Sequence, residues 1–363
     1  MGSHVTYAYE PDFVTPPGEM IEEKLQEIGM SQAELAERIG RARKTVNELI
    51  KGKAPLLPET AVQLERVLGV PARFWASAEA IYRQALAAHE EAQRLATQEE
   101  WLRRLPIRAL VKRGILSREG NRISRLRELL NFFGVASFEA LWRIGEERYL
   151  SFRQSPAHEV DRFALLAWLR LGELQALKVA CAPYDEGKFR QTLSEIRKLC
   201  IEPPPAAAPK MQKVCAESGV ALVFVPEIPG ARAWGVTQWV TADKAILQLS
   251  LRGKSDDQFW FTFFHEAAHI LLHPKRAVYV EFGQEADEHE EEANRFARDV
   301  LIPPAEWRRI AAVPPRSAAQ VRAWAKRLGI APGVLVGRLQ HERFLPWTHL
   351  NGLKVKLRFK EVE

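Results

Sequence analysis

The motif HEAAH at residues 265–269 constrains this chain more than any other feature of its sequence. Histidines four residues apart lie on one face of a helix, so both imidazoles can reach a single ion. Strongly apolar residues on both sides of the motif favour a buried helix, which we expect over Asp256–Leu272. His265 and His269 are therefore the predicted zinc ligands. Glu266 lies beside the ion and is the predicted general base, because a carboxylate there can take a proton from water.

A catalytic zinc usually has three protein ligands and one open position, so the motif requires a third ligand further along the chain. A second helix is expected at about 285–301, and Glu290 is the choice within it. Asn294 follows one turn later on the same face, where its amide can orient a ligand histidine. His289 is a weaker candidate for the third ligand, and Asp287 is weaker still.

Other polar residues near the motif have less definite roles. His273 lies one turn beyond the second histidine and precedes a proline, so we expect it to end the helix and not to bind the ion. Tyr279 and His289 are candidates for stabilising the oxyanion. The strand expected at 232–240 could offer a free edge to an extended peptide.

The N-terminal segment has the pattern of short helices joined by tight turns. Ser31 can cap a helix, and glycines interrupt the apolar pattern at 29, 40 and 52. Two short helices joined by a tight turn form a helix-turn-helix unit. The expected helices are 18–28, 32–39, 44–50 and 58–68.

The remainder of the chain predicts a mainly α fold with a small β-sheet, an α+β class. Residues 76–200 are expected to be helical and 202–209 to form a Pro/Ala-rich linker. After the last expected helix, 317–340 resembles a second helix-turn-helix, for which we expect a structural role. The expected strands are 220–225, 232–240 and 244–249, with a hairpin turn at 241–243 and a last strand at 354–359.

Charge and cysteine content narrow the class of protein. The net charge is +6 over 363 residues, a mild basic excess that is compatible with nucleic-acid contact. Three cysteines without a C-x-x-C pair exclude a disulfide framework and a thiolate zinc finger. No apolar run is long enough for a membrane span and no secretory signal is visible, so a cytoplasmic location is expected. Met1–His4 is interpreted as the remnant of an expression tag.

Around the metal motif the chain resembles the ImmA/IrrE family of metallopeptidases. The resemblance covers roughly 220–343 and depends on FTFFHEAAHILLH at 261–273 and EEEANRFARDVLIP at 290–303. It implies a thermolysin-type zincin with one zinc per chain, held by His265, His269 and Glu290, and with Glu266 as the catalytic acid/base. It also implies proteolysis of a regulatory protein, often a repressor with a helix-turn-helix domain.

Residues 16–86 resemble the HigA/XRE-type repressors and antitoxins. The resemblance implies operator DNA as a partner, with a recognition helix that begins near Arg43. Residues on its outer face can read base edges, whereas the flanking basic residues can contact phosphates. One departure is Ala42, which stands where a capping serine is frequent. The expected DNA-contacting residues are Gln32, Arg41, Arg43, Lys44, Thr45, Asn47, Glu48, Lys51 and Lys53.

Together these observations predict a regulator in which a zinc endopeptidase is joined to an operator-binding domain, and a homodimer is expected because such motifs read paired half-sites. One alternative is a non-catalytic repressor or antitoxin whose C-terminal domain is a sensor or a partner-binding module. Another is a peptidase whose N-terminal module binds a protein. The expected domains are an N-terminal arm at 1–15, a helix-turn-helix domain at 16–98, a helical connector at 99–210, a peptidase domain at 211–345 and a strand or tail at 346–363.

Overall fold

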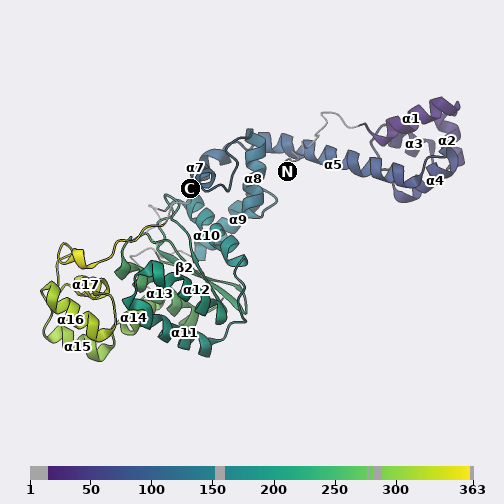
Figure 1. Ribbon diagram of the computed structural model, residues 1–363. Helices are drawn as coiled ribbons and strands as arrows, with labels where there is room; N and C mark the ends of the chain where they lie inside the picture. The colour runs from purple at the N-terminus through teal and green to yellow at the C-terminus, as the bar shows by residue number, and fades with distance from the viewer. Residues whose placement is uncertain (1–14, 152–159, 276–277, 282–287, 360–363) are drawn as a thin grey trace, which may run out of the picture. The chain divides into compact units, whose positions relative to one another are not determined.

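The computed structural model of the protein describes residues 15–151, 160–275, 278–281 and 288–359 (Figure 1). The chain divides into two compact units, residues 1–99 and residues 100–363. As expected from the sequence, most of the described chain is helical, and four strands form one small mixed sheet. No helix in the described ranges is both long and apolar enough to cross a membrane.

From residue 15 onward the first unit contains five helices, and the four expected from the sequence are confirmed to within one residue at each end. Apolar residues from all five helices pack into one core. The last helix contributes Trp75, which is fully buried there. The core includes Leu35 and Ala36 from the second helix and Val46, Leu49 and Ile50 from the third, as their spacing predicts. The helices are α1 (Pro17–Ile28), α2 (Gln32–Arg38), α3 (Arg43–Ile50), α4 (Pro58–Leu68) and α5 (Ala72–Ala96).

Local signals explain the tight turn between α2 and α3. The Ser31 hydroxyl accepts a hydrogen bond from the Glu34 amide at 3.1 Å, which caps the start of α2. Gly40 follows α2 with φ of 67°, a left-handed conformation that glycine adopts without strain. Ala42 begins α3 without a side-chain cap, as its chemistry requires.

The second unit begins with helices that run to residue 217, in agreement with the helical character expected over 76–200. The expected linker at 202–209 is wrong from Pro204 onward, because α12 begins at that residue. Proline is compatible with the first helical turn, where no backbone donor is needed. The elements are α6 (Trp101–Arg104), α7 (Ile107–Lys112), α8 (Arg122–Phe133), α9 (Phe138–Ser151), α10 (Arg162–Leu177), α11 (Glu186–Lys198), the 3-10 turn η1 (Leu199–Ile201) and α12 (Pro204–Glu217).

The sheet has the order β1-β3-β2-β4, in which only β1 and β3 are parallel. The hairpin between β2 and β3 is confirmed. The expectation that the strand at 232–240 has a free edge is wrong for Gly235–Thr237, because β4 pairs there on the side away from β3. The strands are β1 (Val220–Phe224), β2 (Gly235–Thr241), β3 (Lys244–Leu249) and β4 (Tyr279–Glu281).

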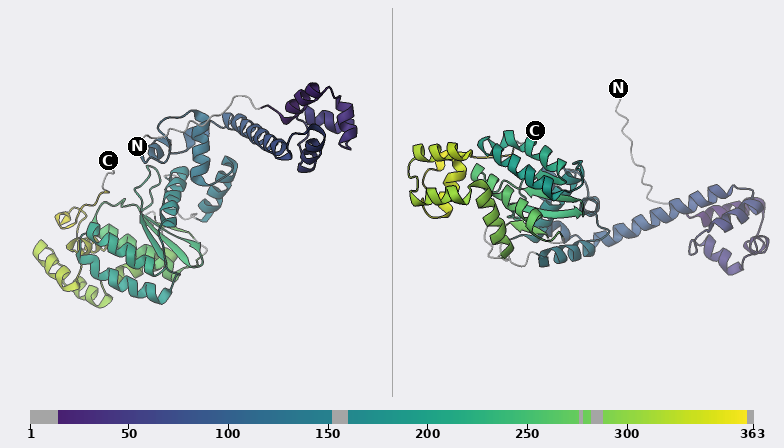
Figure 2. Two further views of the ribbon diagram at one scale, coloured as in Figure 1. Left: turned by 45° about the vertical axis from the view of Figure 1, so that its right-hand side comes forward. Right: turned by 90° about the horizontal axis from the view of Figure 1, so that it is seen from below.

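Helices cover both faces of the sheet (Figures 1 and 2). Alternation along β3 directs Leu247 into the core that contains α13, whereas the amide of Gln248 donates to the Trp168 carbonyl of α10 at 2.8 Å. The metal motif therefore lies on a helix that packs directly on the sheet. The C-terminal elements are α13 (Asp256–Leu272), α14 (Glu288–Leu301), α15 (Pro304–Ala312), α16 (Ala318–Leu328), α17 (Pro332–His341) and the 3-10 turn η2 (Asn351–Leu353).

Two predictions concern the C-terminal segment. The strand expected at 354–359 is wrong, since only an isolated bridge joins Ser255 and Lys356. The second helix-turn-helix pattern corresponds to α16 and α17, joined by the left-handed Gly329. α17 packs so closely on the start of α13 that a methyl group added at Gly337 would lie 2.5 Å from an Asp257 oxygen. This packing supports the structural role expected for 317–340.

Candidate metal centre

The side chains of His265, His269 and Glu290 converge between α13 and α14. The carboxylate of Glu290 lies 3.0 Å from His265 Nε2 and 3.4 Å from His269 Nε2. The two Nε2 atoms are 3.0 Å apart. All three residues are buried, with exposed fractions of at most 4%. The structure therefore brings together the three residues that the sequence predicts as ligands.

These separations fit a bound metal ion. Ligands about 2.0–2.1 Å from a tetrahedral zinc ion are about 3.3 Å from one another, close to the spacing of these three donors. Two imidazoles and a carboxylate are also a donor set that zinc prefers. Burial lowers the pKa of His269 to about 4, so the imidazole is neutral, as a metal ligand must be. The three residues form a candidate metal site.

Outer hydrogen bonds orient both histidines. Asn294 Oδ1 lies 3.1 Å from His265 Nδ1 and can accept its proton, which leaves Nε2 of His265 with its lone pair directed at the site. Asn294 is therefore in the position that the helical spacing from Glu290 predicts. Ala297 and Leu301 continue the same face and are buried.

His269 is oriented by a chain of two hydrogen bonds, through His273 to Glu292, which the sequence pattern did not predict. Its Nδ1 lies 2.7 Å from Nδ1 of His273, and Nε2 of His273 lies 3.3 Å from Glu292 Oε2. Because a short contact between two nitrogens needs one proton between them, His269 donates to His273 when its own Nε2 faces the site. His273 then donates to Glu292. As expected, His273 is the residue at which α13 ends, and it lies outside the three-residue cluster.

Glu266 points toward the sheet. Its Oε2 lies 2.8 Å from the Thr237 hydroxyl on β2. A methyl group added at Gly235 would lie 2.5 Å from Glu266 Oε1, so the glycine leaves room for the carboxylate. Sequence reasoning missed both residues, because they precede the motif by about thirty positions and belong to another element.

Aromatic rings cover the His269 side of the site. Tyr279 on β4 stacks on His269 with ring centroids 4.4 Å apart and an interplanar angle of 17°. The ring of His289 is 4.4 Å from that of His273. Both proposed oxyanion donors therefore lie near the cluster, whereas Asp287 falls outside the described residues. His273, His289 and Glu292 also form a second, more exposed group of possible ligands.

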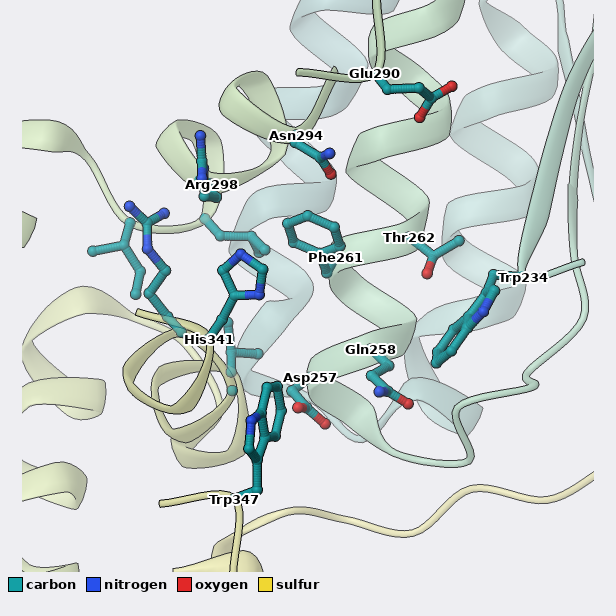
Figure 3. A pocket seen from close by; sticks show the side chains of 15 residues that line it. Trp234, Asp257, Gln258, Phe261, Thr262, Glu290, Asn294, Arg298, His341 and Trp347 are labelled. Atoms are coloured by element: carbon teal, nitrogen blue, oxygen red, sulfur yellow. The ribbon is translucent and has the colours of Figure 1, made fainter. Parts of the chain in front are cut away.

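A cavity of about 390 Å³ adjoins the candidate metal site (Figure 3). Glu290 and Asn294 line its upper part, and Phe261 of α13 projects into the centre of the view. Arg298 and His341 lie on one side, and Trp234 lies on the other. A cavity of this size beside the three convergent ligands can accommodate part of a ligand that also reaches the site.

The predicted DNA-contacting residues lie mostly on the exposed face of α3. Arg43, Lys44, Thr45 and Asn47 are exposed, as are Lys51 and Lys53 just beyond the helix. Five of the predicted residues have intramolecular partners, among them Lys44 and Glu48, which lie 3.9 Å apart on α3. Arg41 Nε donates to Gln63 Oε1 on α4 at 3.2 Å, and Gln32 accepts from Asn47 at 3.5 Å while it donates to Glu22.

The family comparisons match both parts of the chain. The model of the helix-turn-helix family matches residues 21–75. The model of the IrrE N-terminal-like domain matches residues 221–340, which contain the whole candidate metal site. The chain has an N-terminal helix-turn-helix domain of the XRE/HigA-like kind and a C-terminal IrrE N-terminal-like domain of the M78 peptidase family.

Individual relatives match the helix-turn-helix part. An uncharacterised HTH-type transcriptional regulator from Escherichia coli K12, YddM, is 39% identical over 59 residues, which are 16% of this chain and 63% of that protein. The solved structure of the Pseudomonas aeruginosa antitoxin HigA with the higBA promoter is 26% identical, with a TM-score of 0.22, and the match covers 23% of this chain and 91% of that one. A HigA-family antidote protein from Coxiella burnetii is 22% identical, with 23% and 92% of the chains covered and a TM-score of 0.22.

Proposed function

We propose that the protein is a zinc-dependent endopeptidase joined to a DNA-binding domain, and that it hydrolyses peptide bonds of a regulatory protein. The observation that carries the proposal is the three-residue cluster with Glu266 next to one of its histidines on α13. In this proposal residues 211–345 form the peptidase domain, with His265, His269 and Glu290 holding one zinc ion. Residues 16–98 form the DNA-binding domain, and 99–210 connect the two.

The proposed reaction needs few protein groups. When bound, zinc polarises the scissile carbonyl and makes water a better nucleophile. Glu266 accepts a proton from the attacking water as the water oxygen adds to the carbonyl carbon, and it then passes that proton to the leaving amine as the C–N bond breaks. The Thr237 hydroxyl lies 2.8 Å from both the backbone carbonyl oxygen and Oε2 of Glu266, and it holds the carboxylate in place when it donates its one proton to Oε2. Asn294 and the pair of His273 and Glu292 keep the ligand histidines oriented.

The proposal is tested by comparing wild type with Glu266→Gln, each incubated with zinc and with the protein encoded by the neighbouring gene. We expect one zinc per chain in both proteins by mass spectrometry of the metal, and a specific fragment only with wild type. Glu291→Gln is a matched control, because this exposed acid follows Glu290 on the same helix. Cleavage that persists in Glu266→Gln refutes the role of Glu266. Metal binding without cleavage by wild type favours a non-catalytic sensor.

The DNA-binding part of the proposal is supported by the exposed basic residues of α3 and by the family of the N-terminal domain. We propose that the protein binds its own promoter as a homodimer, with α3 in the major groove. Arg43→Ala should weaken binding about 5- to 100-fold, and the affinity of wild type should fall steeply as salt rises. Arg38→Ala, on the preceding helix and paired with Glu34, is the control. Salt-independent binding, or none, would favour an N-terminal domain that binds a protein.

A further inference from the structure

We propose that the cavity beside the metal site binds an acidic side chain of the peptide substrate through Arg298 and Arg338. The inference depends on the proposed peptidase function and adds a substrate class to it. Both arginines line the cavity, and so does Glu290 of the candidate metal site. A ligand that reaches the metal site can therefore also reach the two guanidinium groups.

The first argument is the position of Arg298. Glu290, Asn294 and Arg298 follow one another at intervals of four residues along α14, and all three line the cavity (Figure 3). Eight residues of helix correspond to about 12 Å along its axis. An extended peptide covers that distance in about four residues. The arginine is therefore within reach of a side chain up to four positions from the scissile bond.

The second argument is that the guanidinium of Arg338 is buried with one of its donors unsatisfied. Its side chain is only 12% exposed, its guanidinium lies 4.5 Å from the centre of the Trp307 ring, and Nε is 3.0 Å from Glu342. Nη1 is buried and has no hydrogen-bond partner among the described residues. Burial lowers the pKa of this guanidinium, and Glu342 opposes the effect. A buried donor without an acceptor is costly, so this group is suited to an acceptor that arrives with the ligand.

The third argument is the charge balance of the cavity. Asp257 is the other charged acid that lines it besides Glu290, and Lys354 neutralises Asp257 through an ion pair of 2.7 Å. The backbone carbonyl of Arg298 accepts from the Ile302 amide, but its side chain makes no ion pair or hydrogen bond within the part of the chain that the structure describes. Because Arg338 is already paired with Glu342, the positive charge left for a ligand at this end of the cavity is that of Arg298.

The apolar walls of the cavity indicate that the part of the ligand next to its carboxylate is also apolar. Apolar side chains from three helices and from the C-terminal segment line it, including Phe261, Leu301 and Val334. They are suited to the methylene groups of a glutamate, whose carboxylate would then accept hydrogen bonds from the planar guanidinium groups. Phosphate is a poorer match, because it lacks an apolar stem.

The first experiment profiles the cleavage of a synthetic library of unstructured peptides by the zinc-loaded full-length protein. We expect glutamate or aspartate to be enriched at one position within four residues of the cleaved bond. Arg298→Gln should lower kcat/KM for such peptides about 10- to 100-fold and leave that of their glutamine analogues unchanged. Arg298→Glu should shift the preference to lysine or arginine at that position. Arg295→Gln, an exposed arginine on the same helix, is the matched control.

The second experiment does not require cleavage. N-acetylglutamate amide is titrated into zinc-loaded Glu266→Gln protein, and the side-chain Nε–H resonances of the arginines are followed by NMR. We expect the resonances of Arg298 and Arg338 to shift, and N-acetylglutamine amide to leave them unchanged. Equal responses to the two probes overturn the inference. Cleavage of the library without acidic preference also overturns it while the peptidase function stands, whereas shifts without any cleavage contradict the peptidase function alone.

Discussion

The hydroxyl of Thr237 lies 2.8 Å from Oε2 of Glu266, so a strand residue holds the proposed general base from outside its own helix. We expect Thr237→Val to lower kcat at least tenfold, because the isosteric side chain leaves the carboxylate without this donor. Thr237→Ser should restore most of the activity. Zinc content should be equal in all three proteins. A fully active valine variant would show that the hydroxyl does not position Glu266.

Gly235→Ala should abolish peptidase activity and leave zinc bound. The added methyl group would lie 2.5 Å from Oε1 of Glu266, and a buried carboxylate on a packed helix can yield only by leaving its position. The measurement combines peptide cleavage with metal analysis. Gly352→Ala is the control, since a methyl group added there meets nothing within 4 Å. An active, fully folded Gly235→Ala protein would contradict the close packing.

His273→Ala should weaken zinc binding about 10- to 100-fold, because it removes the group that accepts the proton of His269. Glu292→Gln should have a smaller effect of the same sign. Affinity is measured by competition with a chelator of known zinc affinity. Glu291→Gln is again the matched control. Unchanged affinity in His273→Ala would mean that His269 is held by its packing against Tyr279 alone.

The buried Asp256 at the start of α13 should make stability depend on pH. Burial raises the pKa of this carboxyl from 3.8 to about 6, against the hydrogen bond from the Val355 amide. The folded state therefore binds more protons than the unfolded state between pH 4 and 6, so the free energy of unfolding falls as pH rises through this window. Asp256→Asn should remove this part of the slope of Tm against pH. Asp243→Asn, in an exposed turn, should keep the wild-type slope.

Arg197 should be a major contributor to the stability of the second unit. Its guanidinium donates hydrogen bonds of 2.7–2.9 Å to four carbonyls at the ends of α14 and α16, those of Val300, Leu301, Leu328 and Gly329. Arg197→Met leaves these acceptors unsatisfied and should cost about 3 kcal/mol or more. Chemical denaturation measures the loss. Arg190→Met, which breaks only an exposed pair with Glu186, should change the midpoint little.

The sequence predicted those parts of the molecule that depend on local periodicity. Histidines four apart on an apolar helix, and an acid followed four residues later by an asparagine, define one helix face each, so α13 and α14 were predicted with the residues that line the site. Glycine breaks and a serine cap likewise defined the short helices of the first unit. In each case the signal lies within one or two helical turns.

Only the tertiary structure revealed the contacts that hold the candidate ligands and Glu266 in position. β4 pairs with β2, and Gly235 and Thr237 of β2 lie against Glu266. Glu292 of α14 contacts His273 at the end of α13. Arg298 and Arg338, beside the candidate metal site, belong to α14 and α17 and are forty residues apart in the sequence. Such contacts depend on how the helices pack on the sheet and on one another, and they cannot be predicted from the spacing of residues along the chain.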